Sequence, residues 1–386
     1  MTQQFFDPQR NSLNRPVASD AGDLRMSRRS FLAGSAILGA LAFSGALSGC
    51  SSPTGSATGL AATGDGATGD GADGAGEPIV MVWLPDNSSA DLSGAREVIA
   101  AAITKACGRP AEMLTTVDYN VTIEAIATGK AQIAYLGSEG YVQANRKNPA
   151  VQAAFTESDE EGGLDGACYY SRIAVLAENA EQYRSGATYS IDNIRGASFS
   201  FVSATSTSGF AVPSATIVEK FGLESSDELL ESGSFFSEVL FGNSHQGSAV
   251  NLLSGDADAA AFDDVDVDMY FDLVEGEANT VGARYRVRDD AGDPFEAVHG
   301  KEFVIIGIAP VLNAPICFNE EALPAADREK IVAYFCSDEV ANDPAIFMDP
   351  EDENAKGIWE KESPAKCFVE VDDAWYDPIR ELGGAA

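Results

Sequence analysis

From Pro78 onward, apolar runs of strand length alternate with segments of helical periodicity, and this alternation restricts the possible folds more than any other feature. It predicts strands at 79–84, 131–136, 169–177, 198–202, 258–262 and 303–308, and helices at 96–107, 121–127, 212–221, 245–253 and 325–335. Such alternation is typical of an α/β fold with mainly parallel sheets flanked by helices. Residues 266–300 are acidic and lack periodicity, so we expect an irregular insertion there.

The charge of the chain excludes several classes of function. Its 386 residues include 60 Asp and Glu against 25 Lys and Arg, a formal net charge of −35. Nucleic-acid binding and adsorption to anionic lipid both need a basic surface, so we expect neither. The chain has two histidines, His245 and His299, and no CxxC pair. A zinc site is therefore not expected, and we predict no metal and no cofactor.

The first fifty residues have the pattern of an export signal. Arg28 and Arg29 form a twin-arginine pair, a weakly apolar stretch follows at 31–47, and the sequence LSGC ends at Cys50. Residues 1–50 are therefore predicted to be a twin-arginine lipoprotein signal peptide of a bacterium, with the Cys50 thiol lipidated. The alternative is a transmembrane anchor, but the apolar stretch is short for a span of about 20 residues. Met1 and Met26 both stay open as the true start.

Residues 51–77 consist almost entirely of Gly, Ala, Ser, Thr and Asp. Such a segment buries too little apolar surface to offset its ordering entropy, so we expect a flexible tether. Five more cysteines follow, an odd number that leaves at least one free thiol. One or two disulfides of unknown pairing, or buried free thiols, are the alternatives for Cys107, Cys168, Cys317, Cys336 and Cys367.

Hydroxyl-bearing residues follow one of the predicted strands. The strand at 198–202 leads into Ser206, Thr207 and Ser208, and then into a helix with Pro213 in its first turn. Backbone N–H groups at a helix start, helped by hydroxyl donors, can hold an anion without a cation. The alternative is an ordinary helix cap, because Ser and Thr are preferred capping residues.

Five sequence blocks occur in order along the chain. They are Asp118-Tyr119 with 123–134, Tyr169-Tyr170-Ser171, Ser206 to Phe210 with Val212-Pro213, 244–260, and Pro310 to Pro315. In this order the blocks resemble the phosphate, phosphite and phosphonate substrate-binding proteins of ABC transporters, over most of residues 80–340. The Ser-Thr-Ser-Gly-Phe block before Val-Pro is a specific part of this resemblance.

The resemblance implies a two-lobed type II periplasmic-binding-protein fold that closes on its ligand at two crossover hinge strands. One lobe would comprise residues 78–176 and 310–386, and the other residues 177–309. The hinge strands would lie near 169–177 and 308–315.

The resemblance also implies roles for individual side chains. Tyr119 and Tyr169 would donate phenol O–H groups to the ligand oxygens, and His245 would approach from the second lobe. The anion cradle would consist of Ser206, Thr207 and Ser208.

One departure from the family bears on the ligand. Members that bind aminoalkyl phosphonates have an Asp that can pair with the ammonium group, and Ala314 stands at the matching position here. This difference argues against an amine-bearing ligand. Asp263 and Asp264 are the remaining carboxylate candidates, with solvated surface charge as the alternative. We expect Asp263 to accept a hydrogen bond from protonated phosphite, phosphate or a simple alkylphosphonate.

The predicted function is a binding module and not an enzyme. An extracytoplasmic protein, held to the cell membrane only by the Cys50 lipid, would capture a small phosphorus oxyanion and deliver it to an ABC permease and its ATPase. Two alternatives stay open: a sensory lipoprotein of the same fold, and a secreted hydrolase that uses a Ser with His245 and an Asp. The hydrolase is the weaker one, because the chain has no GxSxG elbow.

Overall fold

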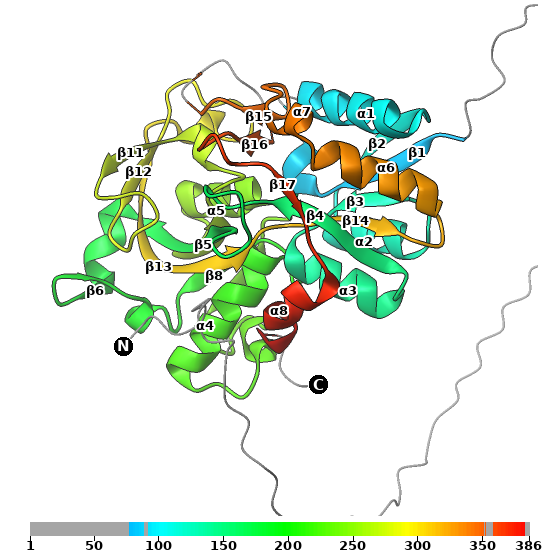
Figure 1. The fold of residues 1–386 in the computed structure, drawn as a ribbon. Helices are drawn as coiled ribbons and strands as arrows, with labels where there is room; N and C mark the ends of the chain where they lie inside the picture. The colour runs from blue at the N-terminus through cyan, green and yellow to red at the C-terminus, as the bar shows by residue number, and fades with distance from the viewer. Residues whose placement is uncertain (1–76, 89–91, 351, 353–357, 383–386) are drawn as a thin grey trace, which may run out of the picture. The chain divides into compact units, whose positions relative to one another are not determined.

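The computed structural model describes residues 77–88, 92–350, 352 and 358–382 (Figure 1). The predicted signal peptide with Cys50, and all of the predicted tether except residue 77, lie outside these ranges. Among the described residues, no helix combines the length and the apolar character that a membrane span requires. The five cysteines at 107, 168, 317, 336 and 367 are all free thiols, but only Cys317 is buried, so the alternative of buried free thiols is met in part.

The first part of the fold is a six-stranded sheet with the strand order β17-β4-β14-β3-β1-β2. Its strands are β1 Ile79–Trp83, β2 Ala111–Thr115, β3 Ile133–Tyr135, β4 Val151–Glu157, β14 Ile316–Asn319 and β17 Phe368–Glu370. Helices α1 Ser93–Cys107 and α6 Ala325–Phe335 pack with Met81 on one face. Helices α2 Tyr119–Ala127 and α3 Ser138–Lys147 pack with Val82 on the other. Neighbouring residues of β1 thus point to opposite faces, as strand geometry requires.

The second part is a seven-stranded sheet with the order β11-β12-β13-β5-β10-β8-β9. Its strands are β5 Cys168–Leu176, β8 Ser198–Phe201, β9 Glu238–Phe241, β10 Ala259–Asp263, β11 Phe271–Glu275, β12 Arg284–Val287 and β13 Glu302–Leu312. Helix α4 Val212–Phe221 packs through Ile217 against the face that carries Ala261. Helix α5 His245–Ser254 packs through Leu252 against the opposite face, which carries Phe262.

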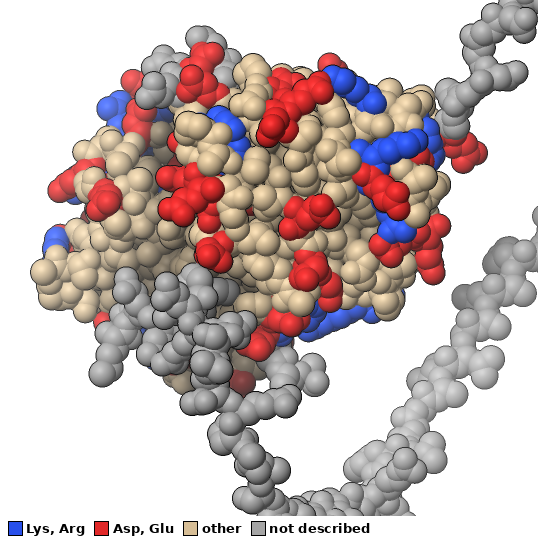
Figure 2. Space-filling model, in the orientation of Figure 1, with Lys and Arg blue, Asp and Glu red and all other residues tan. Residues whose placement is uncertain are grey.

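Shorter elements complete the described part of the chain. They are α7 Asp338–Ala341, α8 Asp377–Leu382, and the two-stranded pairs β6 Arg184–Ser185 with β7 Thr188–Tyr189 and β15 Phe347–Met348 with β16 Trp359–Glu360. Asp and Glu side chains are spread over the face shown in Figure 2, with fewer Lys and Arg among them, as the net charge implies.

The α/β fold is confirmed, but the expectation of mainly parallel sheets is wrong. Strands β1, β2 and β3 pair in parallel in one sheet, and β8, β9 and β10 pair in parallel in the other. All remaining pairs in the two sheets are antiparallel. The parallel strands are those joined by helices α1, α2, α4 and α5, because a parallel connection needs a crossover. Strands β12, β13 and β14 follow one another without an α-helix, and β13 pairs antiparallel with β12.

Two further expectations need correction. Residues 266–300 are not an irregular insertion, because β11 and β12 extend the seven-stranded sheet at its edge. Helix α3 has no counterpart among the predicted helices. By contrast, α4 and α6 begin and end at the predicted residues.

Strands β5 and β13 run antiparallel beside each other, with Leu176 opposite Phe303 and Cys168 opposite Leu312. Both predicted hinge segments therefore overlap the same strand pair of the seven-stranded sheet. The lobe limits at residues 176 and 310 stay predictions.

Candidate functional site

The hydroxyl-rich turn after β8 is built to present Ser208. The Ser206 hydroxyl accepts a hydrogen bond from the Gly209 N–H over 3.0 Å, and residues 207–211 form a short π-helical turn before α4. A Cβ atom at Gly209 would lie 2.3 Å from Val202, so this position accommodates only glycine. Glycine allows the turn to approach the end of β8, and that approach fixes the direction of Ser208.

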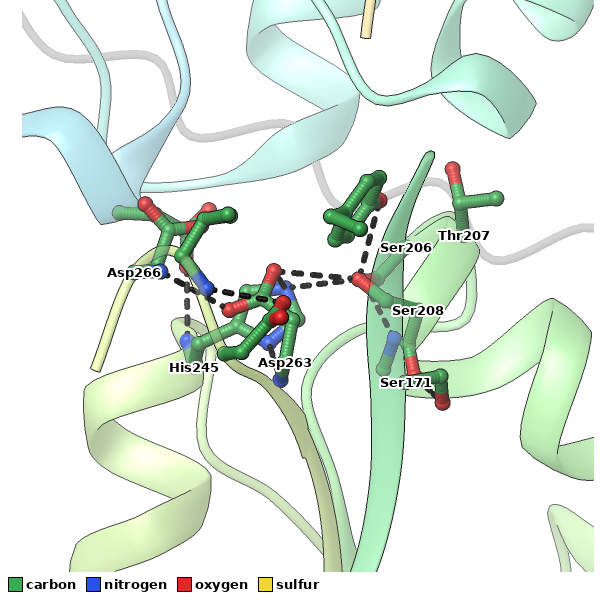
Figure 3. A network of polar contacts seen from close by, with 12 residues as sticks. Ser171, Ser206, Thr207, Ser208, His245, Asp263 and Asp266 are labelled. Carbon is green, nitrogen blue, oxygen red and sulfur yellow. Dashed lines mark hydrogen bonds and ion pairs between the residues drawn. The ribbon is translucent and has the colours of Figure 1, made fainter. Parts of the chain in front are cut away.

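Ser208 is at the centre of a buried hydrogen-bond network (Figure 3). The Tyr169 phenol donates to Ser208 Oγ over 3.2 Å, and Ser208 Oγ donates to Asp263 Oδ2 over 3.2 Å. His245 Nε2 lies 3.4 Å from the same hydroxyl. The Ser171 hydroxyl donates to the Ser208 carbonyl over 2.6 Å, which holds the backbone of the turn against β5. Four of the predicted site residues thus meet at one point.

His245 begins helix α5, and Ser244 is its N-cap. The Asp263 backbone N–H donates to His245 Nδ1 over 2.9 Å, so Nδ1 is the acceptor nitrogen of the imidazole. The proton of the neutral ring therefore lies on Nε2, which is 3.2 Å from Asp263 Oδ2. The backbone of β10 thus makes the imidazole a hydrogen-bond donor toward the Ser208 network.

The sequence left two carboxylates open, and the structure separates them. Asp263 faces Ser208, whereas Asp264 accepts hydrogen bonds from the Tyr170 N–H over 2.9 Å and from Asn279 Nδ2 over 2.8 Å. Neither is a solvated surface charge, because both are buried. Of the two carboxylates, Asp263 is the one that contacts Ser208.

The fully buried Arg172 supports the loop that follows Asp263. Its guanidinium forms an ion pair with Asp268 and donates to Asn279 Oδ1 over 2.9 Å. The ring of Tyr285 lies 4.7 Å from this guanidinium. A buried cation therefore stabilises an acidic loop whose carboxylates would otherwise repel one another.

Ser206 and Thr207 do not join the Ser208 network. The Ser206 hydroxyl caps its own turn, and Thr207 Oγ1 accepts a hydrogen bond from the Glu139 N–H over 2.8 Å. In Figure 3 the Thr207 side chain lies apart from the hydrogen bonds around Ser208. Thr207 thus connects the turn after β8 to the start of α3, and α3 packs on the six-stranded sheet. The predicted three-hydroxyl cradle stays a prediction for these two residues.

Asp86 is the site residue that sequence reasoning missed. It lies in the turn Pro85–Ser88 after β1 and is 2% exposed. The Tyr119 phenol donates to Asp86 Oδ2, and the His245 backbone N–H donates to Asp86 Oδ1 over 2.7 Å. The one available signal was its position after the carboxyl end of a buried parallel strand, where ligands bind in open α/β sheets.

Burial sets the protonation of the network. It raises the pKa of Asp263 well above its ordinary range, with a further increase from Asp264 and Asp86. Burial also raises the pKa of Asp266 strongly, helped by Asp263 and Asp86, and the Asp266 N–H donates to Asp263 Oδ1 over 3.1 Å. The pKa of the Tyr169 phenol is raised by burial as well, so this phenol stays protonated and can donate at neutral pH.

Asp86, His245 and Asp266 each place one ligand-type atom within 4.8 Å of the others. These residue types could hold a metal ion. However, His245 Nδ1 already accepts the Asp263 N–H, and both Asp86 oxygens already accept hydrogen bonds. The cluster is therefore internally hydrogen-bonded, and we propose no metal for it.

Comparison with known proteins identifies the family. The sequence profile described as "ABC transporter, phosphonate, periplasmic substrate-binding protein" matches residues 81–376. The chain belongs to this family. The phosphate-import protein PhnD of Mycolicibacterium smegmatis is 28% identical to this phosphonate-family protein over 209 residues. The match spans 53% of this chain and 62% of the relative, which is less than two thirds of the relative's length.

Solved structures show the same fold. A binding protein component of an ABC phosphonate transporter from Pseudomonas aeruginosa superimposes with a TM-score of 0.54 at 17% identity, covering 79% of this chain and 85% of its own. PhnD1 from Prochlorococcus marinus, in complex with methylphosphonate, gives a TM-score of 0.55 at 15% identity, covering 79% and 96%. This family member therefore has the type II periplasmic-binding-protein fold. Its relatives are binding proteins and not enzymes, which agrees with the sequence prediction.

Proposed function

We propose that the protein is an extracytoplasmic solute-binding protein that captures a small phosphorus oxyanion and delivers it to an ABC permease and its ATPase. The observation that carries the proposal is the buried Ser208 hydroxyl, which is surrounded by Tyr169, His245 and Asp263. These residues offer three neutral donors and one carboxylate at a single point. The names of the relatives, a phosphate-import protein and a methylphosphonate complex, support phosphorus as the central atom of the ligand.

The chemistry of the network suits a protonated oxyanion. The Tyr169 O–H, the Ser208 O–H and the His245 Nε2–H can each donate to a ligand oxygen. Asp263 can accept a hydrogen bond from a P–OH group. Phosphorus oxyanions with a second pKa near ~6 keep that proton part of the time at neutral pH, whereas sulfate has none to offer. We therefore propose phosphite, phosphate or a simple alkylphosphonate as the ligand, and discrimination against sulfate.

The proposal includes attachment to the membrane through a lipid on Cys50, since the LSGC sequence is the lipobox pattern. Incorporation of a labelled fatty acid into the wild-type protein, and its loss in Cys50→Ala, would test this attachment. A protein that stays unlabelled would contradict it.

Binding is tested by titration calorimetry with phosphate, phosphite, methylphosphonate, aminoethylphosphonate and sulfate, with a thermal-shift screen beside it. A specific ligand raises the unfolding temperature as its concentration exceeds Kd. We expect an amine-free phosphorus ligand to bind best and Ser208→Ala to weaken it. No heat from any phosphorus ligand, or a marked preference for aminoethylphosphonate, would overturn the proposal.

A further inference from the structure

Asp86 bridges the two sheets by accepting hydrogen bonds. It follows β1 of the six-stranded sheet, and its Oδ1 accepts the N–H of His245 from α5, which packs on the seven-stranded sheet. Its backbone carbonyl also accepts a hydrogen bond from Gln246 Nε2 over 3.3 Å. The first turn of α5 is therefore attached to the turn after β1 at two points.

The two groups that donate hydrogen bonds to Asp86 are also suited to bind an anionic ligand. The His245 N–H lies at the start of a ten-residue helix, where the helix dipole favours negative charge. The Tyr119 phenol is buried, and burial raises its pKa well above the usual range, so it keeps its proton. Both donors are committed to a carboxylate of the protein itself.

Asp86 also adds negative charge beside the Ser208 network. A carboxylate has about four acceptor positions, and Asp86 uses two of them for Tyr119 and His245. It lies with Asp266 and His245 in a cluster whose ligand-type atoms are within 4.8 Å of one another. A fully ionised oxyanion would meet repulsion from the Asp86 carboxylate, whereas a P–OH group could donate to it.

We propose that Asp86 is a selectivity residue: it withholds the Tyr119 hydroxyl and the His245 N–H from fully ionised oxyanions and presents a second carboxylate that favours a protonated ligand. Tyr119 then acts as a positioning residue that holds Asp86, and Tyr169 is the phenol that touches the ligand. This inference rests on the proposed function. It adds a second residue that selects the ligand, because Asp86 follows a strand of the six-stranded sheet whereas Asp263 ends a strand of the seven-stranded sheet.

The test compares the affinities of wild type and Asp86→Asn for sulfate, phosphite and methylphosphonate by titration calorimetry. Asn has nearly the same shape as Asp but no charge. We therefore expect the affinity for sulfate to rise by about tenfold or more. The ratio of phosphite affinity to sulfate affinity should fall by the same factor. Asp86→Glu, which keeps the charge, is the matched control and should still exclude sulfate. Asp86→Ser retains a hydroxyl acceptor and provides a second neutral variant if Asp86→Asn folds poorly.

The two tyrosines provide a second readout, which a general loss of structure would not produce. In the wild type, Tyr169→Phe should weaken the phosphorus ligand by about tenfold. Tyr119→Phe should change the affinity for the phosphorus ligand by less than about threefold, because the Tyr119 hydroxyl donates to Asp86 and not to the ligand. In an Asp86→Ala background, which has no side-chain acceptor, the Tyr119 hydroxyl is released, and Tyr119→Phe should then weaken sulfate binding.

The outcomes distinguish failure of the proposed function from failure of the selectivity role of Asp86. Equal losses for Tyr119→Phe and Tyr169→Phe in the wild type, or unchanged sulfate affinity in both neutral Asp86 variants, would overturn the role of Asp86. If the wild type binds no phosphorus oxyanion but Asp86→Asn gains sulfate, the proposed function fails and the selectivity role stands. If neither protein binds any of these anions, both fail.

Discussion

The Asp263 backbone N–H donates to His245 Nδ1 over 2.9 Å, and this hydrogen bond determines which nitrogen of the imidazole carries the proton. Strand β10 and helix α5 therefore cooperate in one function. The strand presents the Asp263 carboxylate, and its backbone directs the His245 Nε2–H to the same point.

Replacing His245 with Gln should weaken the preferred phosphorus ligand by about tenfold, because a charge-assisted hydrogen bond is lost. The matched control is His299→Gln. The His299 ring lies 2.7 Å from the Ala291 carbonyl and has no contact with the Ser208 network, so its affinity should match the wild type. Calorimetry measures both variants. A neutral ring with its proton on Nδ1, seen by nitrogen NMR, would contradict the assigned tautomer.

The three hydroxyls of the turn should differ in effect. Ser208→Ala should weaken ligand binding by about tenfold or more, since it removes a donor at the centre of the network. Ser206→Ala should instead lower the free energy of unfolding by about 1 kcal/mol, because it removes a cap. Calorimetry and urea unfolding separate the two effects. Equal affinity losses in both variants would favour the predicted cradle of several hydroxyls over a single central donor.

The buried acids predict how stability depends on pH. The folded-state pKa values of Asp263 and Asp266 lie above the ordinary 3.8, so the folded protein binds more protons than the unfolded chain above that pH. Their contribution to the free energy of unfolding is therefore full at acidic pH and is lost as the pH rises through the raised values. Asp266→Asn should reduce this dependence in urea unfolding between about pH 4 and 8. The exposed Asp256→Asn is the control, and parallel curves for Asp266→Asn and wild type would contradict the assignment.

Arg172 should be essential to the acidic loop. Arg172→Met leaves the buried Asp264 and the half-exposed Asp268 without their cation and should lower the free energy of unfolding by about 2 kcal/mol, less than for an ion pair buried on both sides. A second substitution, Asp268→Asn, should recover part of that loss. The exposed pair of Arg184 and Glu181 is the comparison, and Arg184→Met should change little. Equal effects at the two arginines would show that burial does not matter here.

The sequence predicted those parts of the site that follow from local pattern. Local pattern drew attention to the hydroxyl-rich turn with Ser208, whereas the resemblance to the family singled out His245 and Asp263, at the start of α5 and the end of β10. Asp86 was not predicted as a site residue because Pro-Asp-Asn-Ser has the composition of an ordinary turn. Its hydrogen-bond partner His245 lies 159 residues away in the sequence. Only the tertiary fold brings that turn to the start of α5.

The fold was predicted within the same limits. Helices α4 and α6 were both located to the residue: α4 has Pro213 in its first turn and Gly222 at its end, and α6 follows Pro324. Helix α3 was missed because Gly140 and a run of polar residues hide its buried face. The direction of the strands was predicted wrongly, since sequence alone does not reveal that β13 and β14 belong to different sheets.

Two backbone amides cross between the sheets: Glu139 donates to Thr207, and His245 donates to Asp86. We expect the amide protons of these two residues to exchange slowly with solvent deuterium as long as the two hydrogen bonds are formed. Their exchange rates, followed with and without a bound oxyanion, would report opening and closing at two separate points. If the predicted closure takes place, these two amides would report it without a dye or an added cysteine.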